Sequence, residues 1–262
     1  MKIAGLCSGH DCSYAVLENG IPTIHAELER YLRVKEPLGD SLEFLFDTYG
    51  PYGDIKHFTH CVDTWNGGIR NRYPETFARM QNVLKNNSGN FYEPGHHESH
   101  AANAFFSSNF DEALIVTIDG GGRDYNLTNG KVMITTFTIW KGEGNKIKPI
   151  AIIPIEKLNL GVMWQLCTTN IFGLSGGYPK GNQAGSVMAM AVMGDPTEHY
   201  EYFRAFKGNI QHTNFDFARL QKLASESEEQ RFNIAAALQK VTEDIVRAII
   251  NKYAKDYPSK KL

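Results

Sequence analysis

Apolar residues recur along the chain at two spacings, and these spacings predict a mixture of strands and helices. Two short apolar segments flank Gly9-His10-Asp11, and a third follows Asn19-Gly20, a dipeptide typical of hairpin turns. Further apolar runs predict strands at residues 55–62, 112–119 and 147–156, with a hairpin around Asn129-Gly130 between the last two. Helical spacing covers residues 41–49, 74–84, 98–107 and 231–253. The pattern therefore indicates an α/β protein.

The helix expected at residues 231–253 is the longest, and its apolar side chains lie on one stripe. The stripe consists of Ile234, Leu238, Val241, Ile245 and Ile249. Such a stripe is typical of a helix that packs against a core.

Composition and charge narrow the classes of function. The chain has 262 residues, enough for one large domain or two small ones, and a formal net charge of −2. This charge gives no electrostatic reason to expect nucleic acid or an anionic membrane as a partner. Four cysteines lack the spacing of a metal site, and polar residues interrupt every longer apolar run. We therefore expect a cytoplasmic protein with reduced thiols and no membrane segment.

The densest cluster of histidines lies at the start of the helix expected near residue 98. If the helix begins near Gly95, His96 and His100 lie at positions i and i+4 on one face, where both imidazoles can bind one cation. Nitrogen ligands suit zinc, iron and other first-row metals. His97 points about 100° away and cannot join them. The alternative is that these histidines are polar residues at a solvated helix start.

A run of three glycines follows the strand that ends at Asp119. A buried strand that opens into a glycine turn allows backbone N–H groups to approach an anion closely, so Asp119, Gly120, Gly121 and Gly122 are candidates for phosphate binding. The run is neither a dinucleotide fingerprint nor a Walker motif. The alternative is a plain glycine-rich hairpin.

The loop between the first two strands is a second candidate for phosphate binding. It contains His10, Asp11 and Ser13 at strand ends. Turn chemistry alone would also explain Gly, Asp and Ser at these positions.

Residues 95–122 read GHHESHAANAFFSSNFDEALIVTIDGGG, and this stretch resembles the NodU/CmcH-type carbamoyltransferase family, whose pattern is GHHxSHAxSAFxxSxFxxAxxLxxDGxGE. The resemblance extends to GHDCSYAVLENG and AELERYLRVKE near the amino terminus, and to GNQAGSVMAMAVMGDP further along. In the last segment Ser186 stands where the family has a lysine. That difference bears on phosphate binding, because a lysine near a nucleotide normally neutralises phosphate charge.

The resemblance implies an actin-like ATPase (RNase H-like) fold of two subdomains, each a mixed sheet with flanking helices. We expect the first at residues 1–110 and the second at residues 111–262, truncated before its later strands. In the family, a third metal ligand (an Asp) and the adenine contacts belong to a portion beyond the matched half. The resemblance therefore implies a fragment or one half of a split enzyme, inactive alone, that binds a carboxy-terminal half or associates with itself.

The activity implied by the resemblance is ATP-dependent O-carbamoyl transfer. Carbamoyl-adenylate, made from carbamoyl phosphate and ATP, would donate its carbamoyl group to the hydroxyl of a small-molecule alcohol. His96 and His100 would hold a divalent metal, iron or zinc. His10 would act as the base for the hydroxyl, Lys35 would stabilise developing charge, and Arg33 would lie on the substrate side.

Two alternatives remain open for the function of the chain. The first is a component of TsaD-like threonylcarbamoyl transfer to tRNA, which shares the fold and the two histidines. The second is a non-catalytic, nucleotide-binding half that needs a partner chain.

Overall fold

The computed structural model describes residues 1–8, 11–35, 37, 42–50, 54–61, 68–127, 129–177, 180–211, 213–257 and 261–262. The chain divides into two compact units, Met1–Ser99 with Tyr178–Gly181 and His100–Gly177 with Asn182–Leu262. The division falls inside the continuous helix α5 (His96–Phe106). Each unit contains its own sheet and its own core.

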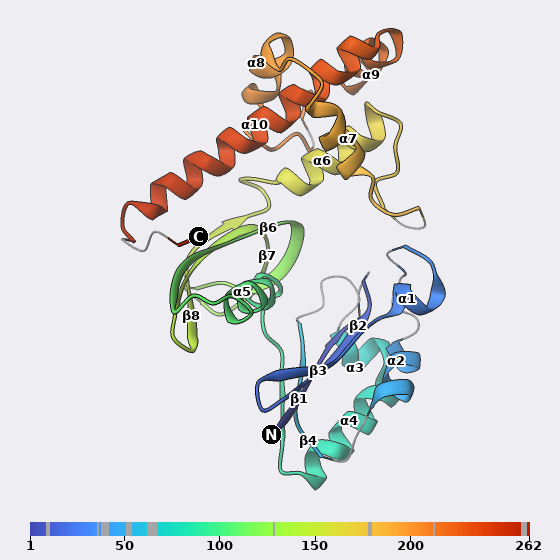
Figure 1. The fold of residues 1–262 in the computed structure, drawn as a ribbon, viewed down its shortest axis with the longest axis vertical. Helices are drawn as coiled ribbons and strands as arrows, with labels where there is room; N and C mark the ends of the chain where they lie inside the picture. Colours follow the sequence, from blue (N-terminus) through green and yellow to red (C-terminus); the bar gives the residue numbers. More distant parts are fainter. Residues whose placement is uncertain are drawn as a thin grey trace. The chain divides into compact units, whose positions relative to one another are not determined.

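A five-stranded mixed sheet forms the centre of the first unit (Figure 1). Its strands, in the order β3-β2-β1-β4-β5, are β3 (Ile21–Glu27), β2 (Ser13–Glu18), β1 (Lys2–Cys7), β4 (Ile55–His60) and β5 (Asn90–Tyr92). The first three strands are antiparallel, whereas β4 runs parallel to β1 and β5 runs parallel to β4. Asn19 and Gly20 both have positive φ, 53° and 84°, as the expected two-residue hairpin requires.

In the described part of the first unit, the helices that accompany this sheet are α1 (Leu28–Leu32), α2 (Leu42–Tyr49), α3 (Gly68–Arg72) and α4 (Pro74–Asn86). Helix α2 packs on β2, and α4 packs on β4. Tyr14, Phe46 and Phe58 are fully buried. The Phe46 ring meets Tyr14 edge to face and Phe58 at a tilt, with ring centroids 6.3 Å apart in both contacts. Alternate strand positions and the inner faces of α2, α3 and α4 supply the rest of this core, as expected of a sheet with helices packed against it.

The second unit begins with an antiparallel meander of three long strands. These are β6 (Glu112–Tyr125), β7 (Val132–Glu143) and β8 (Lys146–Pro154), in the order β6-β7-β8. The turn between β6 and β7 contains Gly130 at φ 67°, where the sequence predicts a hairpin. Strand β6 continues through Gly120, Gly121 and Gly122, so the expectation that it ends at Asp119 and opens into a glycine turn is wrong. A bulge in the middle of the strand accommodates the glycines instead.

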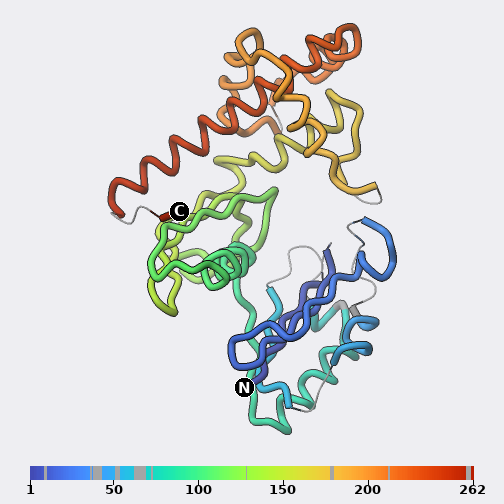
Figure 2. The backbone as a smooth tube through the Cα atoms, viewed as in Figure 1, coloured from blue at the N-terminus to red at the C-terminus, as the bar shows by residue number. Residues whose placement is uncertain are grey.

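Helices form the rest of the second unit (Figure 2). They are α6 (Leu160–Asn170), α7 (Ala184–Ala191), α8 (Thr197–Ala205), α9 (Phe217–Glu226) and α10 (Glu228–Ala254). Helix α10 contacts α7, α8 and α9, and the predicted apolar stripe faces them, with Ile234, Leu238 and Val241 almost fully buried. Among the described residues, no helix has both the length and the hydropathy that crossing a bilayer requires.

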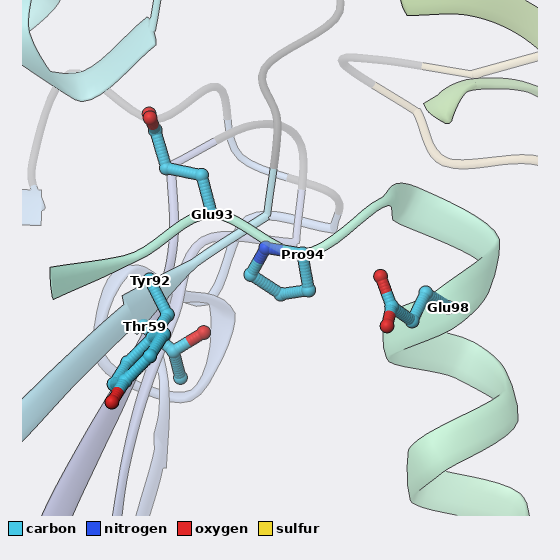
Figure 3. A pocket seen from close by; sticks show the side chains of 5 residues that line it. All are labelled: Thr59, Tyr92, Glu93, Pro94 and Glu98. Carbon is cyan, nitrogen blue, oxygen red and sulfur yellow. The ribbon is translucent and has the colours of Figure 1, made fainter. Parts of the chain in front are cut away.

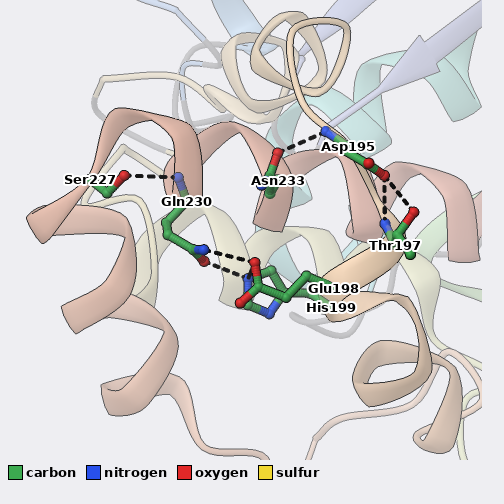
Figure 4. A network of polar contacts seen from close by, with 7 residues as sticks. All are labelled: Asp195, Thr197, Glu198, His199, Ser227, Gln230 and Asn233. Carbon is green, nitrogen blue, oxygen red and sulfur yellow. Dashed lines mark hydrogen bonds and ion pairs between the residues drawn. The ribbon is translucent and has the colours of Figure 1, made fainter.

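A polar network joins the start of α8 to the first turns of α10 (Figure 4). The side chain of Gln230 contacts both His199 Nε2 and Glu198 Oε2 at 2.7 Å, and the His199 side chain is 3% exposed. Asn233 accepts a hydrogen bond from the Asp195 N–H at 2.7 Å. This network fixes the register of α8 along α10.

Replacing Gln230 with alanine is expected to destabilise the second unit by about 1–3 kcal/mol, because the buried His199 ring loses its amide partner. Gln239→Ala on the same helix is the matched control. Its side chain donates to the exposed Glu243, at i+4 on the helix surface, so the cost should stay within about 0.5 kcal/mol. Urea unfolding monitored by circular dichroism measures both changes. Equal losses in the two variants would contradict the structural role given to the network.

Candidate metal centre

Local hydrogen bonds fix the first turn of α5, which carries the candidate histidines. The Gly95 N–H donates to Glu98 Oε2 at 3.1 Å, and the Ser99 hydroxyl donates to the Gly95 carbonyl at 2.9 Å. The Glu98 contact is the carboxylate half of a capping box, which fixes where the helix begins. The start predicted near Gly95 therefore agrees with the structure.

The remainder of α5 is anchored on the sheet of the second unit. Ala101 and Phe105 pack in one cluster with Ala113, Ile115 and Trp140. A Cβ on Gly142 of β7 would lie 2.6 Å from the Phe105 ring, so glycine allows the ring to rest directly on the strand. Helix α5 is continuous from His96 to Phe106.

Three ligand-type side chains come together at this point. One nitrogen each from His96 and His100 and one oxygen from Asp119 lie within 4.8 Å of one another. His100 Nε2 is 3.5 Å from Asp119 Oδ2. The His100 side chain is 55% exposed and the Asp119 side chain 38%, so a small ligand can reach both from solvent.

The β6 bulge positions Asp119. The register with β7 shifts between Ile118 and Gly122, and Gly121 has φ 153°, a conformation that residues with a side chain rarely adopt. A Cβ on Gly161, in the first turn of α6, would lie 2.5 Å from the backbone nitrogen of Gly120. Helix α6 therefore approaches the bulge at backbone contact, and this approach supports the strand where Asp119 leaves it.

The donor set fits a divalent metal. Two imidazoles and one carboxylate are typical of zinc and of non-haem iron sites that keep coordination positions open for water or substrate. Asp119 is predicted to contact phosphate, and the resemblance places the third metal ligand, an Asp, in a portion of the family beyond the matched half. The structure places Asp119 beside the two histidines, which makes it a candidate third ligand. Its contact with phosphate stays a prediction.

His97 takes no part in this cluster. Its side chain is fully buried, and its ring centroid lies 5.1 Å from that of His96 at an interplanar angle of 72°. The expectation that His97 points away from the other two agrees with this placement.

The other predicted site residues belong to the first unit. Asp11 lies in a turn at φ 60°, and Ser13 begins β2. Arg33 ends α1 at φ 56°, and the Lys35 ammonium lies 3.5 Å from Glu29 with its side chain 63% exposed. His10, predicted to be the catalytic base, lies outside the described residues. Roles for these residues stay predictions.

A buried Ser–His pair was not predicted. Ser8 Oγ lies 2.7 Å from His60 Nε2, and both residues are 1% exposed. They stand directly after β1 and at the end of β4, which are neighbouring parallel strands. The bond therefore ties together the two strand ends next to the loop that carries Asp11. Sequence spacing could not reveal it, because the two residues are 52 positions apart.

The first unit also contains an open pocket of about 360 Å³, lined by Thr59, Tyr92, Glu93, Pro94 and Glu98 (Figure 3). Figure 3 shows the Glu98 carboxylate directed toward Pro94 and the Glu93 carboxylate directed away from it. Residue 98 lies about 200° around the helix from His96 and from His100. The pocket is therefore distinct from the three-residue cluster.

Similarities to known proteins are partial. The nodulation protein NolNO of Sinorhizobium fredii (strain NBRC 101917 / NGR234) is 34% identical over 112 residues, which make up 42% of this chain and 14% of that protein. An uncharacterised protein of Synechocystis sp. (strain ATCC 27184 / PCC 6803 / Kazusa) is 28% identical over 180 residues, or 60% of this chain and 26% of that protein. The chain thus spans about a quarter or less of the length of these relatives. No protein-family model matches it.

Among solved structures, a ROK family protein from Streptococcus pneumoniae TIGR4 in complex with sucrose aligns with 94% of this chain and 100% of its own, at TM-score 0.42 and 12% identity. The Lmo2764 protein from Listeria monocytogenes aligns at TM-score 0.38 and 11% identity, over 93% of this chain and 99% of its own. Likeness at this level carries no argument about function. The match to NolNO supports the resemblance to NodU-like proteins.

Proposed function

We propose that this chain is the part of an ATP-dependent O-carbamoyltransferase that binds a divalent metal next to the phosphate of carbamoyl-adenylate. The cluster of His96, His100 and Asp119 carries the proposal, because it joins two neutral donors and one anionic donor at an accessible point. The similarity to NolNO and the family resemblance of residues 95–122 support the transferase class. The nucleotide would bind an actin-like fold.

The metal, iron or zinc, would be held by His96, His100 and Asp119. When bound, it supplies a Lewis acid that polarises a phosphoryl or carbonyl oxygen. The bulge next to Asp119 adds backbone without side chains: Gly120 and Gly121 have no register partner on β7. We assign the close approach of a phosphate oxygen to this backbone.

The transfer itself would be a displacement at the carbamoyl carbon. The acceptor oxygen forms the new C–O bond, the bond to the adenylate phosphate breaks, and AMP leaves with the electron pair. His10 would take the proton of the acceptor hydroxyl, and Lys35 would stabilise the developing negative charge. Glu29, which now pairs with Lys35, would hold that ammonium until substrate arrives.

Nucleotide binding by the full chain tests this proposal. Isothermal titration of ATP or AMP is expected to show binding with Zn²⁺ or Fe²⁺ present and at least tenfold weaker binding after chelation. Asp119→Asn should remove this metal dependence. Asp111→Asn, at the exposed residue just before β6, is the control that should preserve it. The proposed function would be overturned if the chain binds metal at the cluster but binds neither ATP nor AMP, whether metal is present or absent.

A further inference from the structure

Two cysteines stand at the ends of neighbouring strands in the first sheet. Strand β1 pairs in parallel with β4, and the register matches Leu6 with His60. Cys7 and Cys61 each follow that pair by one residue. Neighbouring strands lie about 4.8 Å apart, and a disulfide joins Cα atoms that are about 4.4–6.8 Å apart. If the register continues by one residue, the two thiols are therefore within bonding range.

A hydrogen bond at the same place shows that the two strand ends stay together. Ser8 Oγ lies 2.7 Å from His60 Nε2, and both residues are buried. Ser8 is the residue after Cys7, and His60 is the residue before Cys61. The bond therefore crosses from one strand end to the other at the position of the cysteines, and it limits how far these can separate.

The two cysteines share one face of the sheet, and this face is open to solvent. A Cβ added to Gly5 would lie 3.5 Å from the Thr59 side chain, so the register partners Gly5 and Thr59 point the same way. Cys7 and Cys61 come two residues later and point that way too, because side chains alternate along a strand. Thr59 also lines the open pocket of Figure 3. Both cysteines are partly exposed, whereas Cys12 is buried, so a small oxidant can reach the pair.

We propose that Cys7 and Cys61 form a redox-sensitive dithiol that a hydroperoxide converts into an intramolecular disulfide. One thiolate attacks the peroxide oxygen, the O–O bond breaks, and a sulfenic acid forms with loss of hydroxide. The second thiolate attacks the sulfenic sulfur, the S–S bond forms, and a second hydroxide leaves. The two thiol protons convert both hydroxides into water, so one hydrogen peroxide oxidises one pair. A thiol reductant reverses the change by exchange.

The bond would close beside the segment predicted to contact phosphate. Cys7 is the last residue of β1, and Asp11 lies four residues further along the chain. Both cysteines are thiols in the structure, as expected of a pair that is oxidised only transiently. An effect of the bond on nucleotide binding rests on the proposed function, whereas formation of the bond does not.

Peptide mapping of the full chain tests the proposal. The reduced protein is treated with one equivalent of hydrogen peroxide, alkylated while folded, and digested with trypsin and with a protease that cleaves before aspartate. Cleavage before Asp11 separates Cys7 from Cys12, so mass spectrometry assigns the link to a single cysteine. We expect both Cys7 and Cys61 to lose alkylation together and to appear as one linked peptide pair, which dithiothreitol separates.

The other two cysteines are internal references in the same sample. Cys12 is fully buried, and burial raises the pKa of the Cys167 thiol well above its usual range, so both should resist the oxidant and react only after unfolding. The Cys61→Ser variant changes a partly exposed side chain. It should abolish the link and leave Cys7 as a sulfenic acid, which dimedone traps.

Each outcome decides for or against the dithiol. A link between Cys7 and Cys61 within one chain, with Cys12 and Cys167 unchanged, supports it. Non-reducing gel electrophoresis distinguishes a link within a chain from a link between chains. A bond to Cys12, a covalent dimer as the main product, or no link with a large excess of peroxide overturns the proposal.

Discussion

The His100→Ala variant is expected to bind Zn²⁺ or Fe²⁺ about 100-fold more weakly than the unchanged chain, or more weakly still. Outer partners of metal ligands already contribute 10–100-fold to affinity, and a ligand itself contributes at least as much. His96→Ala should have a similar effect, because the cluster supplies only two nitrogens and one carboxylate. Folding should be almost unaffected, since the His100 side chain is 55% exposed.

Titration of the metal-free proteins by calorimetry measures this change. His25→Ala is the matched control, because its imidazole is 64% exposed on β3, where it pairs with Glu27. Affinity close to that of the unchanged chain is expected for this control. If His100→Ala binds as tightly as His25→Ala, the metal is held elsewhere and the assignment of the cluster fails.

Gly161→Ala is expected to cost the second unit about 3 kcal/mol or more. The added methyl group would meet the backbone of Gly120 and Asp119 rather than a side chain that can rotate away. Overpacking usually costs about 1–3 kcal/mol even when side chains can adjust, and typical stability is about 5–15 kcal/mol. The strand must shift at its bulge to relieve the contact, so Asp119 should also move and metal affinity should fall.

Gly185→Ala on α7 is the control, since a Cβ there would meet nothing within 4 Å. Alanine in a helix is favoured over glycine by about 1 kcal/mol, so this variant should be as stable as the unchanged chain or more so. Thermal unfolding compares the two variants. A Gly161→Ala protein with an unchanged midpoint and unchanged metal affinity would show that α6 does not support the bulge.

Short-range patterns in the sequence predicted much of this architecture. The hairpins at Asn19-Gly20 and Asn129-Gly130 follow from residues that tolerate positive φ, and the pairing of His96 with His100 follows from helical geometry alone. The stripe on α10 predicted its buried face. These features depend on neighbours within a few residues, which a sequence displays directly.

Features that depend on distant residues were missed. The run of glycines after Asp119 is compatible with a turn or with a bulged strand, and the choice is made by packing against Gly161. The position of Asp119 Oδ2, 3.5 Å from His100 Nε2, follows from the bulged strand, and its contact with phosphate stays a prediction.

Helices α7 to α9 pack on α10 and were left without assignment. Helix α9 nevertheless buries Leu220 and Ala224 at helical spacing, a signal that the sequence displays. The pairing of Ser8 with His60 depends on the parallel register of β1 and β4.

The contact between α6 and the β6 bulge has a consequence for how such chains can diverge. Gly161 has no room for a side chain because the backbone of Gly120 occupies that space. Substitutions at position 161 are therefore coupled to changes in the backbone at position 120. A residue larger than glycine at position 161 would have to arise together with a shorter or absent bulge, and the shorter bulge would withdraw the carboxylate at position 119. In related chains that lack the two histidines, we therefore expect residues other than glycine at the position of Gly161.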